Sequence, residues 1–304
     1  MKRGKVILRF SGFIVLLINF QVLSGQDLNI TQYPFYRDGL NPASFVQNND
    51  LNIFVLYNNE FSGFEAQPHT QLFDLSMNLK GHKLGLLVTN DVIGFDKTQN
   101  FKLRFAKQFS LDSKSFFSFG LGAGAVHKKI EATKLTFEFK DDPVSFFDYS
   151  YTDLDFDLGA EFQTEKYFIG ISAVHLTKNI SQFKTFSPVA HYYAYGQYTI
   201  KSNNPFRFYP NVLMRLWKNT FFGEAGLMAF YKDITWIGST YSIYHDISFS
   251  TGLRVRKNIL FGYAFKSNMN ARILKPLGTN THEVFLNFSV NYNNNSLKTP
   301  RFID

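Results

Sequence analysis

The stretch THEVFLNFSVNY, residues Thr281–Tyr292, alternates between apolar and polar side chains along almost its whole length. One set of alternate positions is apolar and consists of Val284, Leu286, Phe288, Val290 and Tyr292. The other set is polar apart from Phe285 and consists of Glu283, Asn287, Ser289 and Asn291. Because successive side chains of a strand point to opposite sides, this pattern predicts a β-strand with one apolar face and one polar face.

The same alternation recurs along nearly the whole chain. It predicts about fourteen strands, an even number, as bacterial single-chain barrels have. The predicted strands are Leu51–Tyr57, Gln71–Leu79, Lys83–Asn90, Asn100–Phe109, Ser115–Lys128, Asp153–Gln163, Tyr167–His175, Ala190–Thr199, Arg207–Leu216, Phe221–Tyr231, Ile234–Ser242, Asp246–Arg254, Leu260–Phe265 and Thr281–Tyr292. We expect the last of them to pair with the first, so that no sheet edge is left in lipid.

Composition favours a membrane barrel over a soluble all-β sandwich, which would also show alternation. The chain contains 36 Phe and 16 Tyr, residues that favour strands and membrane interfaces. Mean hydropathy is nevertheless only −0.15, as expected when half of each strand faces lipid and half faces a polar lumen. We predict an all-β fold, a transmembrane antiparallel up-and-down β-barrel. The absence of Cys excludes disulfides and thiolate metal sites.

The first 25 residues have the pattern of a secretory signal peptide. Met1–Lys5 is basic, Phe10–Leu23 is apolar, and the small residues Ser24 and Gly25 follow. Polar residues interrupt the apolar run, which makes it poorly suited to serve as an uncleaved membrane anchor. We predict cleavage near residues 24–26. Four basic residues lie in this segment, which has no acidic residue, so the net charge falls from 32 − 24 = +8 to 28 − 24 = +4. No basic stripe predicts nucleic-acid binding.

The rest of the chain divides into a leader and a barrel. Residues 26–50 form an irregular leader, where Pro34 and Pro42 disfavour regular pairing, and we expect this leader to plug the barrel or lie at its rim. Residues 51–304 form the predicted barrel. Its connections alternate in length. Short ones at 80–82 and 164–166 predict a turn-lined periplasmic rim, and long ones predict an extracellular rim. The long connections span 58–70, 129–152, 178–189 and 266–280.

The acidic stretch from Asp153 to Glu161 superficially resembles a calcium loop. Its glycine falls one position late, and the intervening Leu154, Phe156 and Leu158 favour a strand. We therefore interpret the carboxylates as lumen-facing groups. Buried charges need partners. The expected partners are lumen arginines such as Arg104, Arg215 or Arg254.

No sequence motif indicates catalysis. The glycines between residues 120 and 124 lack the spacing of a dinucleotide fingerprint, and neither a G-x-S-x-G elbow nor an H-E-x-x-H pair is present. A phospholipase in the barrel wall would need a Ser/His pair, for which no motif exists. We predict that the protein is not an enzyme and holds no cofactor or metal. Five scattered histidines, of which two could converge in a barrel, are His127, His175, His191, His245 and His282.

From residue 26 to the end, the chain resembles the PorP/SprF family of type IX secretion system outer-membrane proteins of Bacteroidetes. No single motif is specific, but their order is. The residues that carry the resemblance are Asn41, Pro42, Ala43, Asn90, Asp91, Gly94, Gly120, Gly124, Gly159, His175, Trp236, Gly262, Tyr263, His282, Glu283, Pro300, Arg301 and Phe302. The chain departs from the family pattern after Ala43, at Tyr57–Phe61 and at Thr299, where the family commonly has Cys.

The resemblance implies a non-enzymatic barrel in the bacterial outer membrane that serves type IX secretion and gliding motility. It implies that the protein is needed for secretion or surface anchoring of a cargo adhesin, whose C-terminal domain it docks. The implied partners are the lipid bilayer, the adhesin and possible periplasmic motor or peptidoglycan-linked components. A passive channel or small-molecule transporter is the alternative. The lumen distinguishes them, because fourteen strands enclose a channel unless side chains or the leader fill it.

Overall fold

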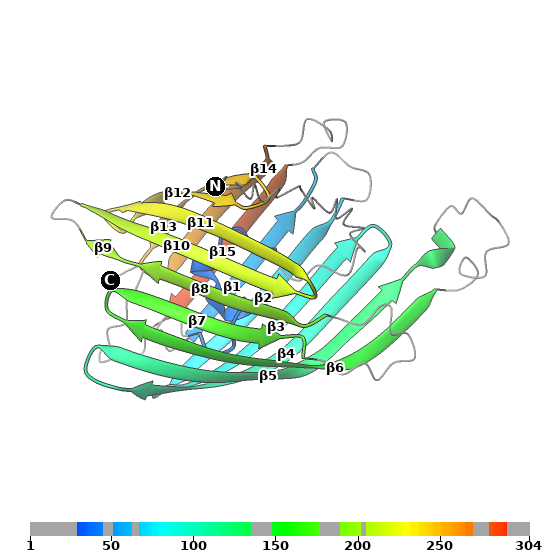
Figure 1. The fold of residues 1–304 in the computed structure, drawn as a ribbon, viewed down its shortest axis with the longest axis horizontal. Coiled ribbons are helices and arrows are strands. Elements are labelled where there is room, and N and C mark those ends of the chain that lie inside the picture. The colour runs from blue at the N-terminus through cyan, green and yellow to red at the C-terminus, as the bar shows by residue number, and fades with distance from the viewer. Residues whose placement is uncertain are drawn as a thin grey trace, which may run out of the picture.

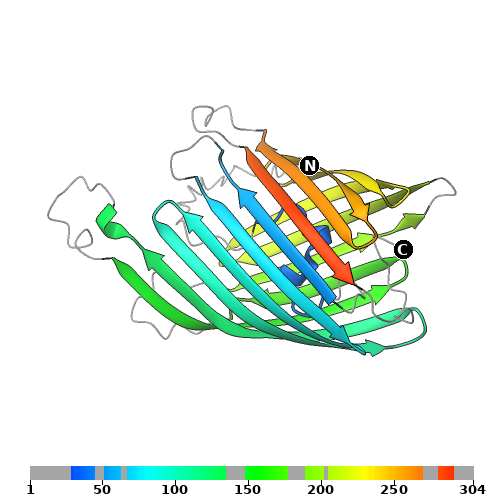
Figure 2. The same ribbon diagram turned by 180° about the vertical axis from the view of Figure 1, so that it is seen from behind.

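The computed structural model describes residues 29–44, 51–62, 67–134, 148–176, 189–201, 205–269 and 280–290. Within these ranges the chain forms one closed antiparallel barrel of fourteen strands (Figures 1 and 2). The strand segments are β1 (Leu51–Asn59), β2 (His69–Leu79), β3 (His82–Ile93), β4 (Asp96–Ser110), β5 (Ser115–Ile130), β6 (Tyr149–Thr164), β7 (Tyr167–Val174), β8 (His191–Tyr198), β9 (Ile200–Lys201), β10 (Phe206–Trp217), β11 (Thr220–Tyr231), β12 (Thr235–Ser242), β13 (Asp246–Arg256), β14 (Ile259–Asn268) and β15 (Thr281–Val290). The two-residue β9 continues β8 along the same neighbour, β10, and so adds no separate strand to the wall.

Each strand pairs with the next in sequence, and β15 closes the barrel against β1. The closing register runs from Leu51 opposite Val290 to Asn59 opposite His282. This confirms the pairing expected from the alternation of Thr281–Tyr292. All fourteen predicted strands are present, with ends that differ by a few residues. A single closed sheet rules out the soluble sandwich.

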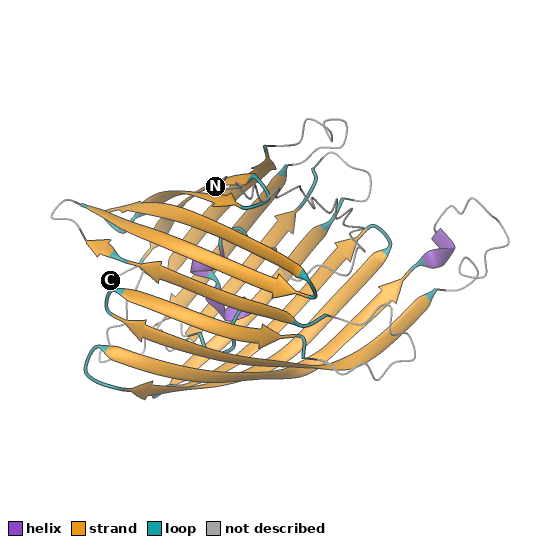
Figure 3. Cartoon of the chain, in the orientation of Figure 1, coloured by secondary structure: helices purple, strands orange, loops and turns teal. Residues whose placement is uncertain are grey.

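Apolar side chains cover the outside of the barrel and charged side chains lie within it. Leu103, Leu121 and Ile237 are more than half exposed on the outer face, whereas Asp74 and Asp155 are fully buried. This distribution is inverted relative to a soluble protein and matches a wall that faces lipid. The described helices are three single turns of 3₁₀ type (Figure 3). No helix among the described residues is long and apolar enough to cross a membrane.

The apolar outer face ends at a sharp boundary on β2–β6. Its last row, in which each residue pairs with the next across the strands, consists of Phe73, Val88, Phe101, Ala125 and Leu154. The adjoining row is polar and consists of Gln71, Asn90, Gln99, His127 and Thr152. Hydrogen bonds link members of the polar row, including Gln99 to Asn90 at 3.3 Å. The boundary of the apolar layer therefore falls between these two rows.

The two ends of the barrel differ in the connections that they carry. The turns at 80–81, 165–166 and 257–258 lie at one end, here called the turn rim, together with the start of β1 and the end of β15. The strand ends that adjoin the four predicted long connections lie at the opposite end, here called the loop rim. The structure thus confirms that they share one rim. The predicted signal peptide, residues 1–25, and Pro300, Arg301 and Phe302 lie outside the described residues.

Candidate functional site

The described part of the leader, residues 29–44, lies inside the barrel (Figures 1 and 3). It forms two short 3₁₀ turns, η1 (Tyr33–Phe35) and η2 (Arg37–Gly39), and pairs with no strand among the described residues. Pro34 fits the first turn because the missing N–H has no helical partner there. Tyr33 and Arg37 are each 1% exposed. Because an irregular buried segment cannot satisfy its own backbone, barrel side chains must meet its polar groups.

The first described leader residues are held near the loop rim. Asn29 donates to Glu60 Oε1 at 3.2 Å, just beyond the end of β1. The backbone N–H groups of Thr31 and Gln32 donate to the two carboxylate oxygens of Glu283, each at 2.8 Å. Glu283 is 1% exposed on β15. One buried carboxylate therefore fixes two consecutive backbone donors, and hydrogen bonds to a charged acceptor are among the strong ones.

An aromatic cluster holds the middle of the leader. The ring centroid of Phe35 lies 4.7 Å from that of Trp236 and 5.2 Å from that of Phe285. Tyr36 stacks on Phe54 with centroids 4.4 Å apart. This explains why Phe285 interrupts the polar face of β15: it points into the lumen, is 2% exposed and packs against the leader. Aromatic pairs at such distances add to the stabilisation from burial.

Arg37 forms the most enclosed ion pair of the leader. Its Nε and Nη2 donate to Glu161 Oε2 and Oε1, each at 3.2 Å. Its guanidinium carbon lies 3.6 Å from the centroid of the Phe168 ring. The Tyr195 hydroxyl donates to Glu161 Oε2 at 2.5 Å. Bidentate pairing together with a cation–π contact uses the planar geometry of arginine, which lysine lacks.

A second group of charges holds the turn after Tyr36. Asp38 pairs with Lys83 of β3, and its carbonyl accepts from Arg104 Nη1 at 2.5 Å. Arg104 also pairs with Asp74, which accepts from the Tyr36 hydroxyl. All four charged residues are buried, and each of the two carboxylates has a cation beside it. Buried ions that are paired in this way avoid the large cost of an isolated buried charge.

The segment Asn41–Ala43 rests on two glycines. Gly120 of β5 lies opposite Gly159 of β6. A Cβ on Gly159 would lie 1.8 Å from Asn41 Oδ1, and a Cβ on Gly120 would lie 2.3 Å from the Ala43 nitrogen. Asn41 Nδ2 donates to the carbonyl of Ala160 at 3.0 Å. The leader therefore contacts the sheet backbone directly, where only glycine leaves enough space.

The acidic stretch of β6 pairs with Lys102. Lys102 Nζ lies 2.8 Å from Asp155 Oδ2 and 2.8 Å from Asp157 Oδ1. His175 Nδ1 lies 2.6 Å from Asp155, and the His175 and His191 ring centroids are 6.3 Å apart. Two of the scattered histidines thus converge. Carboxylates and a lysine in this arrangement neutralise one another, and no group of three metal-ligating side chains for an ion occurs in the described parts of the chain.

The three arginines named from the sequence do not pair with these carboxylates, although Glu161 pairs with another arginine, Arg37. Arg104 pairs with Asp74, Arg215 lies over the Trp217 ring at 4.7 Å, and Arg254 donates to the Lys257 carbonyl. The reason is the glycine row of β5: Gly124 lies between Lys102 of β4 and Asp155 of β6 in the pairing register. Since Gly124 has no side chain, Lys102 can reach across one strand.

Other family-motif residues fall into two groups. Gly262 faces the lumen, where an added Cβ would lie 2.2 Å from the Phe285 ring, and Trp236 belongs to the aromatic cluster. On the outside, Tyr263 and His282 form a 2.8 Å hydrogen bond. Asn90 also lies on the outside, in the polar outer row. Two further motif residues lie near the β3–β4 turn: Asp91 accepts a hydrogen bond from Thr70 at 2.6 Å, and Gly94 adopts a φ of 61° in the turn itself.

Sequence reasoning missed most of the side chains that hold the leader. Asp74, Lys83, Lys102 and Tyr195 were not singled out, and neither was Arg37 of the leader. The available signal was a single charged residue at an inward position of an otherwise apolar or neutral strand, such as Asp74 between Leu72 and Ser76. That signal identifies a buried charge but not its partner.

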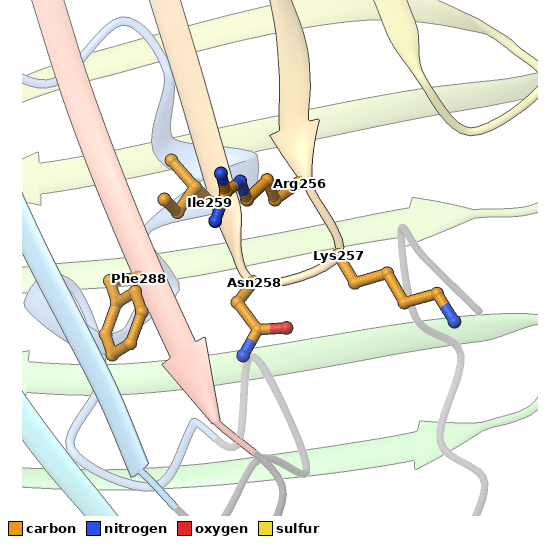
Figure 4. A pocket seen from close by; sticks show the side chains of 5 residues that line it. All are labelled: Arg256, Lys257, Asn258, Ile259 and Phe288. Carbon is orange, nitrogen blue, oxygen red and sulfur yellow. The ribbon is translucent and has the colours of Figure 1, made fainter.

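A small hollow lies outside this interior site, at the turn between β13 and β14 (Figure 4). It is an open hollow with a volume of about 550 Å³, lined by Arg256, Lys257, Asn258, Ile259 and Phe288. Ile259 and Phe288 are paired neighbours on β14 and β15. The hollow is at the turn rim and has no contact with the leader cluster. It offers basic and apolar groups but no carboxylate.

Comparison with known families decides the identity of the barrel. The model of the family "Type IX secretion system membrane protein PorP/SprF" matches residues 22–288. The chain belongs to the PorP/SprF family. This confirms the resemblance drawn from the ordered motifs and places this PorP/SprF protein in the outer membrane. No curated protein matches the chain.

Solved structures share the fold of this PorP/SprF protein at very low sequence identity. The TodX monoaromatic hydrocarbon channel deltaS2 mutant is 10% identical, with a TM-score of 0.51 over 83% of this chain and 93% of that one. The CymD monoaromatic hydrocarbon channel is 12% identical, with a TM-score of 0.50 over 87% of this chain and 94% of that one. At such identities the likeness supports the barrel architecture alone.

Proposed function

We propose that this PorP/SprF barrel is a non-enzymatic docking protein that holds the C-terminal domain of a cargo adhesin for type IX secretion or surface anchoring. Family membership supports a place in the secretion and gliding motility system. The observation that supports docking over conduction is that described leader residues lie inside the lumen and contact its wall. Leader residues such as Arg37 and Asp38 are ion-paired to the wall, and an aromatic cluster surrounds Phe35.

Docking is proposed for the loop rim. Outer-membrane barrels carry short turns on the periplasmic side and longer loops outside, so the loop rim is the extracellular one. The turn rim is then the side available to periplasmic motor or peptidoglycan-linked components. In this arrangement, the barrel wall and its leader form a rigid support, and the surface cargo and the motor contact opposite ends.

A passive channel or small-molecule transporter is the second candidate. It is favoured by the barrel's likeness to TodX and CymD, which are both described as monoaromatic hydrocarbon channels. The two candidates differ in conductance. If the leader plugs the lumen as we propose, purified protein in planar bilayers is expected to show no stable openings. Large and reproducible openings of the intact protein would contradict the docking proposal.

The direct test is affinity isolation of the tagged barrel from its native envelope in mild detergent. We expect one large surface adhesin to co-isolate with the barrel in a fixed ratio. A tagged outer-membrane barrel from another family, isolated in parallel, controls for adhesins that adhere to any barrel. If no adhesin follows the barrel in mild detergent, the transporter becomes the better interpretation.

A further inference from the structure

Among the described residues, one edge of β6 has no strand paired to it beyond Phe156. β6 pairs with β5 along its whole length, from Thr164 opposite Ser115 to Tyr149 opposite Ile130. On its other side, its ladder with β7 covers only Leu158–Gln163, and one further bond joins the Leu176 N–H to the Phe156 carbonyl at 2.9 Å. Beyond Phe156, no described residue pairs with this side of β6. In Figures 1 and 2, β5 and β6 extend well past β7.

The groups on this edge can be assigned from strand geometry. In an antiparallel sheet, the N–H and C=O of one residue point to the same neighbour, and alternate residues point to opposite neighbours. The Phe156 carbonyl points to the β7 side, because it accepts from Leu176. Leu154, Thr152 and Ser150 therefore present their backbone groups on that side as well. We call these three residues the β6 edge.

The β6 edge begins in the apolar layer and continues into the loop rim. Leu154 belongs to the last apolar row of the outer wall and is 55% exposed, whereas Thr152 belongs to the adjoining polar row. Unpaired peptide groups at the level of lipid are unfavourable, because no water can satisfy them. An extended strand is the partner that matches a row of alternating N–H and C=O groups.

We propose that the β6 edge binds an extended strand of the cargo protein by β-strand addition. This inference rests on the proposed docking function and names the surface that performs it. The edge lies at the rim assigned to cargo, and its outward side chains Ser150 and Thr152 are polar. A strand added there would continue the barrel wall outward from β6 and complete the ladder above Phe156.

A second copy of the same chain cannot fill this edge symmetrically. Two identical strands that pair antiparallel are related by a two-fold axis perpendicular to their sheet. Because the barrel wall stands upright in the membrane, that axis would lie in the membrane plane and would invert one barrel. A parallel arrangement of two copies would leave an unclosed, head-to-tail contact. Symmetric pairing of two barrels is therefore excluded at this edge, and we assign the edge to a strand of the cargo protein.

The test uses two substitutions at one position of the β6 edge. Thr152→Pro removes an N–H that points away from β5, so the β5–β6 ladder keeps its bonds, and proline is tolerated on edge strands. Thr152→Val keeps the N–H and loses only the hydroxyl that contacts His127 at 2.9 Å. We expect Thr152→Pro to reduce adhesin co-isolation at least tenfold and Thr152→Val to leave it within twofold. Outer-membrane abundance and heat-modifiable gel mobility report on folding of both variants.

The outcomes separate the edge from the docking function. Adhesin co-isolation that survives Thr152→Pro would overturn the edge inference and leave docking intact, whereas no adhesin with the unmodified barrel would overturn both. Hydrogen exchange provides a measurement that does not depend on a variant that folds poorly. Amides of Ser150, Thr152 and Leu154 should exchange at least tenfold more slowly in the isolated complex than in the barrel alone, and equal rates would contradict strand addition.

Discussion

The contacts around three glycines, Gly120, Gly124 and Gly159, depend on the absence of a side chain at these positions. Gly120 and Gly159 leave the backbone of β5 and β6 open to the leader, and Asn41 hydrogen-bonds to that backbone. Gly124 lies in register between Lys102 and Asp155, and an added Cβ there would lie 1.9 Å from the Phe101 carbonyl oxygen of β4. At each of these positions the absence of a Cβ determines which distant residues come into contact.

Substitution of Gly159 tests the contact with the leader. In Gly159→Ala the new Cβ would lie 1.8 Å from Asn41 Oδ1, so the leader must move. We expect a loss of about 1–3 kcal/mol in the free energy of unfolding in bilayers, as for overpacked cores. Trypsin cleavage after Arg37, which is 1% exposed, should become faster. Gly223→Ala is the matched control, because its Cβ would have no neighbour closer than 3.5 Å. Equal behaviour of the two variants would contradict this account.

At the scale of elements, the strands were predictable because the apolar and polar faces of each strand can be read from the alternation in its own sequence. Alternation over ten residues identifies a strand whatever its partners are, and the even number with its short turns indicated closure. The ends were less predictable. β6 begins at Tyr149 rather than Asp153, because its first residues lie above the apolar layer, where polar side chains occupy the outer face as well.

The leader could not be positioned from sequence in the same way. Its prolines predicted an irregular segment, and irregular segments have no period that reports which face is buried. Its contacts join residues more than a hundred positions apart, such as Arg37 with Glu161 and Thr31 with Glu283. Single-sequence reasoning sees both members of such a pair and has no means to match them. It therefore assigned the β6 carboxylates to the wrong cations.

The apolar outer band gives a prediction for a single strand, β4. Leu103→Arg places a charge in the middle of the band, whereas Gln99→Arg places it in the polar row of the same strand face. We expect Leu103→Arg to lower the free energy of unfolding in bilayers by about 2–4 kcal/mol and Gln99→Arg by about 1 kcal/mol or less. Urea titration in lipid vesicles measures both. A similar cost at the two positions would place the membrane boundary elsewhere.

At the scale of the whole molecule, the leader links strands of the barrel that are not paired with one another. Its hydrogen bonds and ion pairs reach strands on all sides of the lumen, which are β1, β2, β3, β4, β6, β7, β10, β14 and β15. An empty barrel of this size would be a water-filled tube. The leader instead gives the barrel an interior like that of a soluble protein, with an aromatic cluster and paired charges.

Loosening the leader should open the lumen. Arg37→Ala removes the bidentate contacts to Glu161 and leaves that carboxylate buried without its cation, which is strongly unfavourable. We expect the variant to show brief openings in planar bilayers, whereas the unmodified protein is silent. Arg207→Ala removes a partly exposed pair with Asp233 and is the control. Openings that are equally frequent in both variants would show that the leader does not seal the lumen.

The direction of the leader predicts which residues face the outside of the cell. Asn29 lies beside Glu60 near the loop rim, and Ser44 lies beside Lys83 near the turn rim. Because the chain has no Cys, single cysteines can be labelled without background. Asn29→Cys should react with a membrane-impermeant maleimide on intact cells, and Glu165→Cys on the turn rim only after permeabilisation. The reverse pattern would invert the barrel.

The clamp of Glu283 on Thr31 and Gln32 has a consequence for the order of assembly. The leader is enclosed on every side, so it cannot be threaded through a finished barrel without breaking its charged contacts. We therefore expect the strands to wrap around it, and β15, which completes the wall, also carries Glu283, which binds Thr31 and Gln32. In this order of assembly, the pairing of β15 with β1 and the binding of the leader by Glu283 occur in the same step.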